Sequence, residues 1–151
     1  MRAEGWRALA LLMTLMGCGV ETYRQAPPDP SIAMRFVAEG EEAVALTLPR
    51  YDTGEPLALE EGILIEASHV DHVQLYETGE GERLVVIDLT DVGRERLREA
   101  TTARVGARLA IIAGDRVIAA PTIREPLTEG EAYVTVPAAR IEEVWDALGE
   151  Q

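Results

Sequence analysis

The stretch from Leu84 to Pro126 constrains the fold of this chain more than any other part of its sequence. A short apolar run, Leu84–Leu89, leads into a segment with helical periodicity, and a second apolar run, Leu109–Ala113, follows it. The dipeptide Gly114-Asp115 then separates this run from a third one, Val117–Ala120. Apolar runs of this length on either side of a Gly-containing turn are typical of paired strands. The order therefore predicts a strand, a helix and a β-hairpin.

The helix of this unit has recognisable ends. Thr90 or Asp91 can cap its first turn, and Gly106 can supply the left-handed residue that follows its last turn. Its predicted apolar stripe consists of Val92, Leu97, Ala100, Ala103 and Val105. In the hairpin that follows, a two-residue loop that begins with Gly predicts a type II′ turn.

The flanking segments predict further antiparallel strands and one more helix. Ile32–Val37 and Ala43–Leu48 are predicted to form a first hairpin, and Val73–Glu77 is predicted to pair with the run that begins at Leu84. Ala132–Val136 is the last predicted strand. The final helix has one apolar stripe at helical spacing, made of Ile141, Val144, Trp145 and Leu148. We therefore predict an α+β fold, a mostly antiparallel sheet with two amphipathic helices on one face.

The N-terminal residues predict an export signal rather than a part of the fold. Arg2 and Arg7 form a basic region, and Ala8–Met16 is an apolar run too short to span a membrane. The run leads into Leu15-Met16-Gly17-Cys18, which resembles the lipobox of bacterial lipoproteins, and Cys18 is the only cysteine. The resemblance implies that residues 1–17 are a lipoprotein signal peptide and that the lipidated Cys18 anchors the chain to a membrane. The alternative is a soluble exported protein with one spare thiol.

The segment after the lipobox predicts a spacer between the membrane and the folded domain. Gly19, rather than Asp, follows the cysteine, and by the same resemblance this favours the outer membrane of a bacterial envelope, facing the periplasm. Pro27, Pro28 and Pro30 favour extended conformations, so residues 18–31 are predicted to form a Pro-rich tether. A single folded domain is then predicted for residues 32–151, a length that suits one domain.

Charge and residue types narrow the function. The formal net charge of −13 repels phosphate backbones, so we predict no binding to nucleic acid. The only serines are Ser31 and Ser68, and neither lies in the Gly-x-Ser-x-Gly setting of a hydrolase nucleophile. The sequence also lacks a phosphate-binding loop. We therefore predict a protein that is not an enzyme and needs no cofactor.

One cluster of polar residues supports an alternative function. His69, Asp71 and His72 fall within four residues of one another, and such side chains can supply part of a metal site. The alternative is a metal-assisted hydrolase of the cell envelope that uses these three residues. The simpler interpretation is an exposed polar turn ahead of a strand, because the sequence does not nominate the remaining ligands.

The placed residues also carry a family resemblance. The chain from about Val73 to Leu148 resembles the head subdomain of the first periplasmic (P1) domain of SecD, a subunit of the bacterial protein-export machinery. The matching positions are Gly93, Leu97, Thr101, Val105-Gly106, Leu109-Ala110-Ile111, Val117, Ala120-Pro121, Ile123, Glu125-Pro126-Leu127 and Gly130. Two features differ from the family pattern. The family's Asp-Gly turn is inverted to Gly114-Asp115, and residues 134–137 replace its Ile-x-Gly-x-Phe element.

The resemblance implies a fold and a binding surface rather than proton-driven export, because no membrane-spanning run follows Leu148. We expect a periplasmic interaction module that contacts an extended polypeptide or another envelope protein, in protein export or in envelope assembly. Strand addition at an open sheet edge is the expected mode. The candidate binding edge consists of Val117, Ala119, Ala120, Pro121 and Ile123, since a proline blunts an edge against uncontrolled pairing. The alternative is a buried strand end.

The lipidation hypothesis yields the first testable prediction. Cys18→Ser removes the thiol that would carry the acyl chains, so lipid labelling should disappear and the precursor should stay unprocessed or be mislocalised. Metabolic labelling with a fatty acid and fractionation of the envelope check this. Normal processing and membrane retention of the variant would contradict it.

Overall fold

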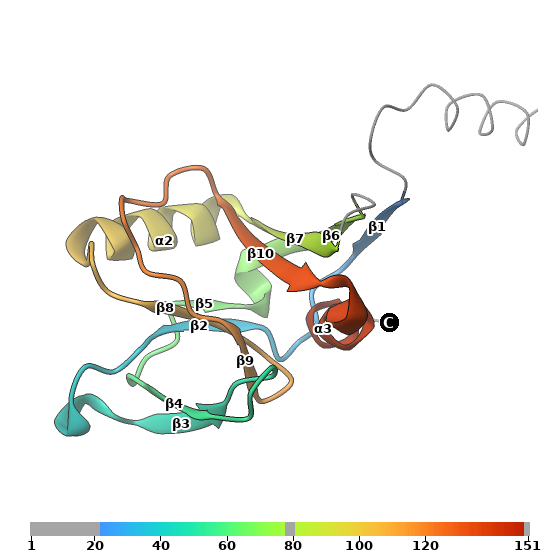
Figure 1. Cartoon of the computed structure of the whole chain (residues 1–151). Helices are drawn as coiled ribbons and strands as arrows, with labels where there is room; N and C mark the ends of the chain where they lie inside the picture. The colour runs from blue at the N-terminus through green and yellow to red at the C-terminus, as the bar shows by residue number, and fades with distance from the viewer. Residues whose placement is uncertain (1–21, 78–80, 150–151) are drawn as a thin grey trace, which may run out of the picture.

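The computed structural model describes residues 22–77 and 81–149, whose strands form two four-stranded sheets and one two-stranded sheet (Figure 1). The strands are β1 (Thr22–Ala26), β2 (Ala33–Phe36), β3 (Leu46–Pro49), β4 (Pro56–Leu59), β5 (Ile65–Glu66), β6 (Val70–Glu77), β7 (Glu82–Leu89), β8 (Leu109–Ala113), β9 (Arg116–Ala119) and β10 (Glu131–Pro137). The α-helices are α2 (Asp91–Ala103) and α3 (Ile141–Leu148), and short 3-10 turns are η1 (Glu41–Ala43), η2 (Ala67–His69) and η3 (Ala138–Arg140).

All pairings between these strands are antiparallel. Sheet I has the order β1-β6-β7-β10, sheet II has the order β5-β2-β8-β9, and β3 and β4 form a separate pair. The prediction of a mostly antiparallel α+β fold is therefore confirmed.

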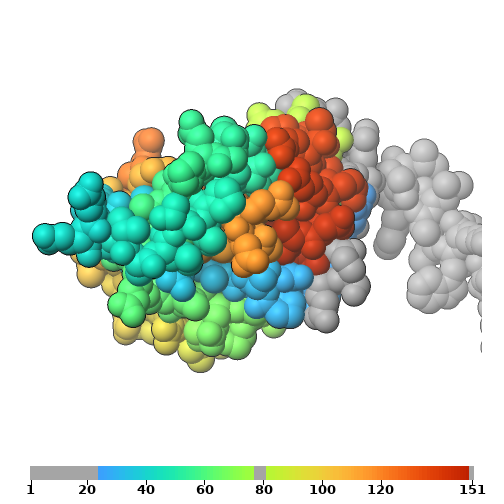
Figure 2. Space-filling model, turned by 90° about the horizontal axis from the view of Figure 1, so that it is seen from below, coloured from blue at the N-terminus to red at the C-terminus, as the bar shows by residue number. Residues whose placement is uncertain are grey.

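The structure has three layers, with sheet II in the middle. Sheet I and the two helices lie on one side of it, and the β3–β4 pair lies on the other. The main core contains Leu97 of α2, Trp145 of α3 and Ile111 of β8, together with the inward side chains of sheet I. Both helices thus pack on the same side of sheet II. A second, smaller core contains Leu59 of β4 and Ile112 of β8, so the β3–β4 pair covers the opposite face of sheet II. Figure 2 shows this pair in cyan to green, next to the orange β8–β9 hairpin and the red C-terminal segment.

The folded part begins earlier than predicted. Strand β1 starts at Thr22 and pairs with β6 over its whole length, and the Asp29 N–H donates to the Leu148 carbonyl at 2.8 Å. The predicted tether over residues 18–31 is therefore wrong from Thr22 onward, and residues 18–21 lie outside the described part. The sequence does not mark this strand because β1 is a polar edge strand. Its Arg24 forms a two-point ion pair with Glu142 of α3 instead of packing in the core.

The predicted first hairpin is also wrong. Strand β2 pairs with β5 and β8, whereas β3 pairs with β4. Gly40 has a φ of 114° and leads into η1, which separates the two strands. The difference has a physical reason: Met34 of β2 is fully buried, so β2 takes the middle of a sheet, while β3 is largely exposed and needs only one partner.

The other predicted elements are present. Strands β6 and β7 form the second hairpin, and β10 is the last strand. The Thr90 hydroxyl caps α2 by accepting from the Gly93 N–H at 3.1 Å, and Gly106 has a φ of 96°. All four residues of the predicted stripe on the last helix are buried: Ile141, Val144, Trp145 and Leu148.

Two local details of the central unit differ from prediction. Gly114 and Asp115 have φ values of 58° and 62°, so the turn has left-handed backbone at both central positions, as in type I′ rather than type II′. The buried face of α2 consists of Gly93, Leu97 and Thr101. Val92 and Val105 of the predicted stripe are instead 62% and 53% exposed.

No helix within residues 22–77 and 81–149 combines the length and the apolar character that a membrane crossing requires.

A close backbone approach explains why a glycine faces inward from α2. A Cβ on Gly93 would lie 2.5 Å from the His69 carbonyl oxygen. That oxygen cannot move away easily, because it accepts from both the N–H and the hydroxyl of Thr90, at 2.9 and 3.2 Å. The first turn of α2 therefore approaches η2 this closely only because residue 93 has no side chain, whereas Leu97 packs in the main core.

Gly93→Ala should consequently destabilise the domain, although alanine is ordinarily the better helix former. Overpacking costs about 1–3 kcal/mol and should outweigh the propensity gain of about 1 kcal/mol. Thermal unfolding followed by circular dichroism measures the effect, with Val92→Ala, at the exposed neighbouring position of the same turn, as the control. An unchanged or higher melting temperature for Gly93→Ala would contradict the proposed contact.

Candidate functional site

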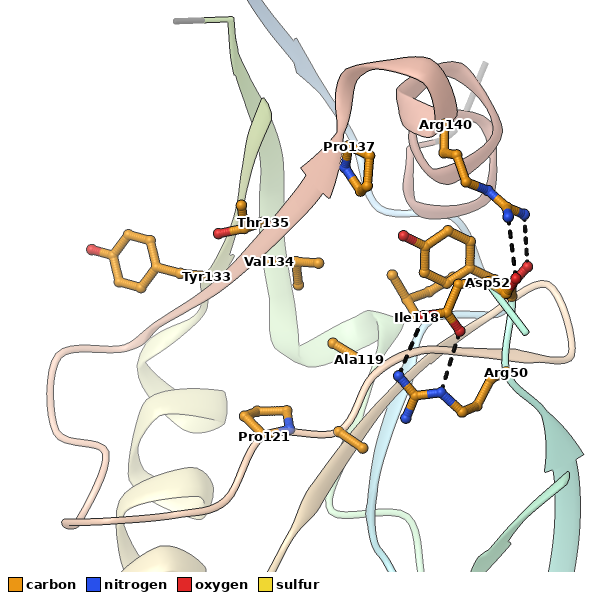
Figure 3. Close-up of a pocket in the computed structure, with 12 residues that line it drawn as sticks. Arg50, Asp52, Ile118, Ala119, Pro121, Tyr133, Val134, Thr135, Pro137 and Arg140 are labelled. Carbon is orange, nitrogen blue, oxygen red and sulfur yellow. Dashed lines mark hydrogen bonds and ion pairs between the residues drawn. The ribbon is translucent and has the colours of Figure 1, made fainter. Parts of the chain in front are cut away.

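A groove of about 430 Å³ lies between the open edge of sheet II and the open edge of sheet I. One wall of the groove is formed by β9 and the residues that follow it, including Ile118, Ala119 and Pro121. Its other wall is β10, including Val134 and Thr135. Figure 3 shows Val134 pointing from β10 toward Ile118, while the ring of Tyr133, which also lines the groove, extends in the opposite direction from β10. The groove is thus a slot bordered by two strand edges, with apolar side chains between them and the polar side chains of Arg50, Asp52 and Arg140 also in its lining.

The predicted binding edge divides into buried and accessible residues. Val117 and Ile123 are 1% and 3% exposed and belong to the two cores. Ala119 and Ala120 are half-buried and Pro121 is exposed, and these three line the groove. The chain stays paired after β9, because the Leu109 N–H donates to the Pro121 carbonyl at 2.9 Å.

The start of the β9 edge is covered by the loop after β3. The Tyr51 N–H donates to the Val117 carbonyl at 3.0 Å, and Arg50 forms a parallel bridge with Val117. The loop therefore leaves the edge uncovered only after Val117, where the Ile118 side chain is buried and Ala119 is the first residue with a partly accessible side chain.

Arg140 holds this loop against the start of α3. Its guanidinium donates to the carbonyls of Tyr51, at 2.8 Å, and Asp52, at 3.2 Å, and lies 5.0 Å from the centre of the Tyr51 ring. Glu143 joins Arg140 to Arg116 of β9, with contacts of 2.9 and 2.5 Å. These hydrogen bonds from Arg140 and Arg116 hold the pKa of Glu143 below its ordinary value. The network connects three elements at one end of the groove.

The β10 edge was missed by the sequence analysis. The Leu89 N–H donates to the Gly130 carbonyl, and the Ala138 N–H donates to the Gly81 carbonyl, both at 2.9 Å. Gly130 and Ala138 flank β10, and successive residues of an antiparallel strand direct their backbone groups alternately toward and away from the partner strand. The residues of β10 with even numbers therefore direct their backbone N–H and C=O groups toward β7. The backbone groups that point away from sheet I belong to Glu131, Tyr133 and Thr135. The available signal was the alternation in Val134-Thr135-Val136, which predicts the strand but not its place at an edge.

The histidine cluster does not form one site. The two ring nitrogens of His72 lie 2.7 Å from Asp71 and 3.0 Å from Asp88, whereas the His69 Nδ1 accepts from the Glu66 N–H at 3.2 Å. Within residues 22–77 and 81–149, no three His, Cys, Asp or Glu side chains gather in an arrangement suited to a metal ion. Cys18 lies outside the described residues, so its lipidation stays a prediction.

A profile of the family described as SecDF, P1 head subdomain, matches residues 41–139. The chain is also 34% identical over 71 residues to the protein translocase subunit SecD of Treponema pallidum (strain Nichols). That match covers 47% of this chain but only 12% of the SecD chain.

Two solved structures share the fold. One is a structure of SecDF described as a membrane component that enhances protein export, with a TM-score of 0.53, 22% identity and coverage of 89% of this chain and 61% of that chain. The other is a crystal structure of SecDF in a super-membrane-facing form, with a TM-score of 0.57, 22% identity and coverage of 95% of this chain and 19% of that chain. This chain therefore spans less than two thirds of these relatives.

The Arg140 network yields a prediction about the groove wall. Arg140→Lys keeps the charge but cannot donate to two carbonyls and a carboxylate from one planar group. We expect amide hydrogen exchange at Tyr51 to accelerate by about tenfold or more, because each hydrogen bond to a charged group contributes about 1.5–3 kcal/mol. Arg124→Lys, at an exposed arginine outside the network, is the matched control. Equal exchange at Tyr51 in both variants would show that Arg140 does not hold the loop.

Proposed function

This chain belongs to the SecDF P1 head subdomain family, and we propose that it serves as a non-catalytic binding module of the bacterial cell envelope, linked to protein export. The observation that carries the proposal is the groove between two strand edges in a fold of this family. The relatives are described as a protein translocase subunit and as a membrane component that enhances protein export. We propose that this chain contacts an extended polypeptide or another envelope protein.

Strand addition is the proposed binding mode. The outward backbone groups of Tyr133 and Thr135 can donate to and accept from an added strand, and side chains of that strand can enter the groove beside Ile118 and Ala119. Main-chain hydrogen bonds tolerate many sequences, which suits a protein that contacts unfolded polypeptides. In the proposed mode the partner pairs mainly with β10, and the predicted β9 edge forms the opposite wall of the groove.

We also propose that lipidated Cys18 anchors the module to the outer membrane, facing the periplasm. Three residues lie between Cys18 and Thr22, the first residue of β1, and the four residue-to-residue steps that join them span at most about 14 Å. The anchor would thus hold the domain close to the bilayer rather than at the end of a long tether.

Nuclear magnetic resonance of the isotope-labelled chain tests the binding mode. Titration with a reduced and carboxymethylated, permanently unfolded lactalbumin should shift the amide signals of Ile118–Ala120 and of Tyr133 and Thr135. Signals of the covered face near Leu59 should remain unchanged. Absence of shifts along both edges would contradict the proposed function.

A pair of variants separates strand addition from simple apolar contact. The Thr135 N–H points away from β7, so Thr135→Pro removes an outward donor without breaking the sheet I ladder. We expect its affinity to fall by about tenfold, since a hydrogen bond contributes about 1 kcal/mol and the ring also blocks close approach. Thr135→Val keeps the donor and should bind normally. Equal binding by both variants would contradict strand addition at β10.

A further inference from the structure

Two smaller hollows extend the groove along the surface. A hollow of about 240 Å³ shares Pro121 with the groove and is lined mainly by apolar side chains, including Ile123 and Leu127. A hollow of about 390 Å³ shares Leu127 with the second hollow and Tyr133 with the groove. The three hollows therefore border one surface that follows β10 toward its first residue.

The charge changes along this surface. Arg50 and Arg140 line the groove, but both are paired with carboxylates, Asp52 and Glu143. The hollow at the start of β10 is lined by Glu125, Glu129 and Glu131 together with apolar and hydroxyl side chains. This end of the surface thus presents carboxylates in excess.

Nearby arginines offset only part of this charge. Arg124 lines the second hollow, and the Arg94 guanidinium packs against the backbone of Gly130. The Tyr133 hydroxyl donates to Glu131, and this hydrogen bond, with partial desolvation and the nearby carboxylates of Glu129 and Asp88, raises the pKa of Tyr133 to about 12. A cation placed here would meet a negative local environment in a chain whose net charge is already −13.

Resting on the proposed function, we infer that this surface selects extended polypeptides in which an apolar segment adjoins basic residues. The apolar side chains occupy the slot beside Ile118 and the hollow at Ile123 and Leu127. The basic side chains lie beside Glu129 and Glu131. Strand addition to β10 supplies the main-chain contacts, and the carboxylates supply the preference for charge.

Three fluorescein-labelled ten-residue peptides test this inference on the full chain. All three carry the same alternating Val and Ile core, and they end in two Lys, two Ser or two Glu. We expect the Lys peptide to bind about threefold to tenfold tighter than the Glu peptide at low salt, because each exposed ion pair contributes modestly. Fluorescence anisotropy measures the affinities. The preference should shrink as added salt screens the charges.

Matched variants locate the source of the preference. Glu129→Gln combined with Glu131→Gln should reduce the preference for the Lys peptide over the Glu peptide to less than about twofold, because the variant cannot form ion pairs with the lysines of the peptide at these two positions. Glu41→Gln combined with Glu42→Gln, on the exposed turn η1 away from the groove, should leave it unchanged.

The outcomes distinguish this inference from the proposed function. Equal binding of the Lys and Glu peptides, or a preference that survives Glu129→Gln with Glu131→Gln, overturns the charge selection while leaving strand addition intact. Failure of all three peptides to bind, together with an absence of shifts with unfolded lactalbumin, overturns both.

Discussion

Burial of strand β8 on both faces is the constraint on which the other layers depend. All five residues of Leu109–Ala113 are buried. Leu109 and Ile111 enter the main core with sheet I and the helices, whereas Ala110 and Ile112 enter the second core under β3 and β4. A strand with apolar side chains on both faces is stable only when both faces are covered. The hydrophobic effect therefore requires three layers.

This arrangement also creates the groove. Strand β9 follows β8 through a two-residue turn and has to lie at the edge of sheet II, while β10 lies at the edge of sheet I beside β7. The main core joins the two sheets, so their free edges face the same space. The loop at Tyr51 covers the first part of the β9 edge, which leaves β10 with the longer accessible row of backbone groups.

Local patterns predicted the central unit of the fold, and long-range contacts decided the rest. The runs from Leu84 to Ala120 give the right strands and helix, because each element is marked by its own periodicity and caps. The pairing of β2 with β8 joins residues such as Met34 and Ile111, and no local pattern specifies such a partner. Polar β1 is held by pairing with β6 rather than by apolar alternation. The accessible β10 edge depends on sheet order, so the candidate site was predicted only on its β9 wall.

The buried face of α2 supports the acidic hollow at the start of β10. The fully buried Thr101 hydroxyl donates to the Leu97 carbonyl at 2.7 Å and accepts from the Leu127 N–H at 2.9 Å. It thereby fixes the loop that presents Glu125 and Glu129. Because this buried hydroxyl both donates and accepts a hydrogen bond, its burial does not destabilise the fold, even though helical periodicity alone favours an apolar residue at this position. The helix therefore helps to place carboxylates in the hollow at the start of β10 as well as filling the core, and the same face of the helix makes both sets of contacts.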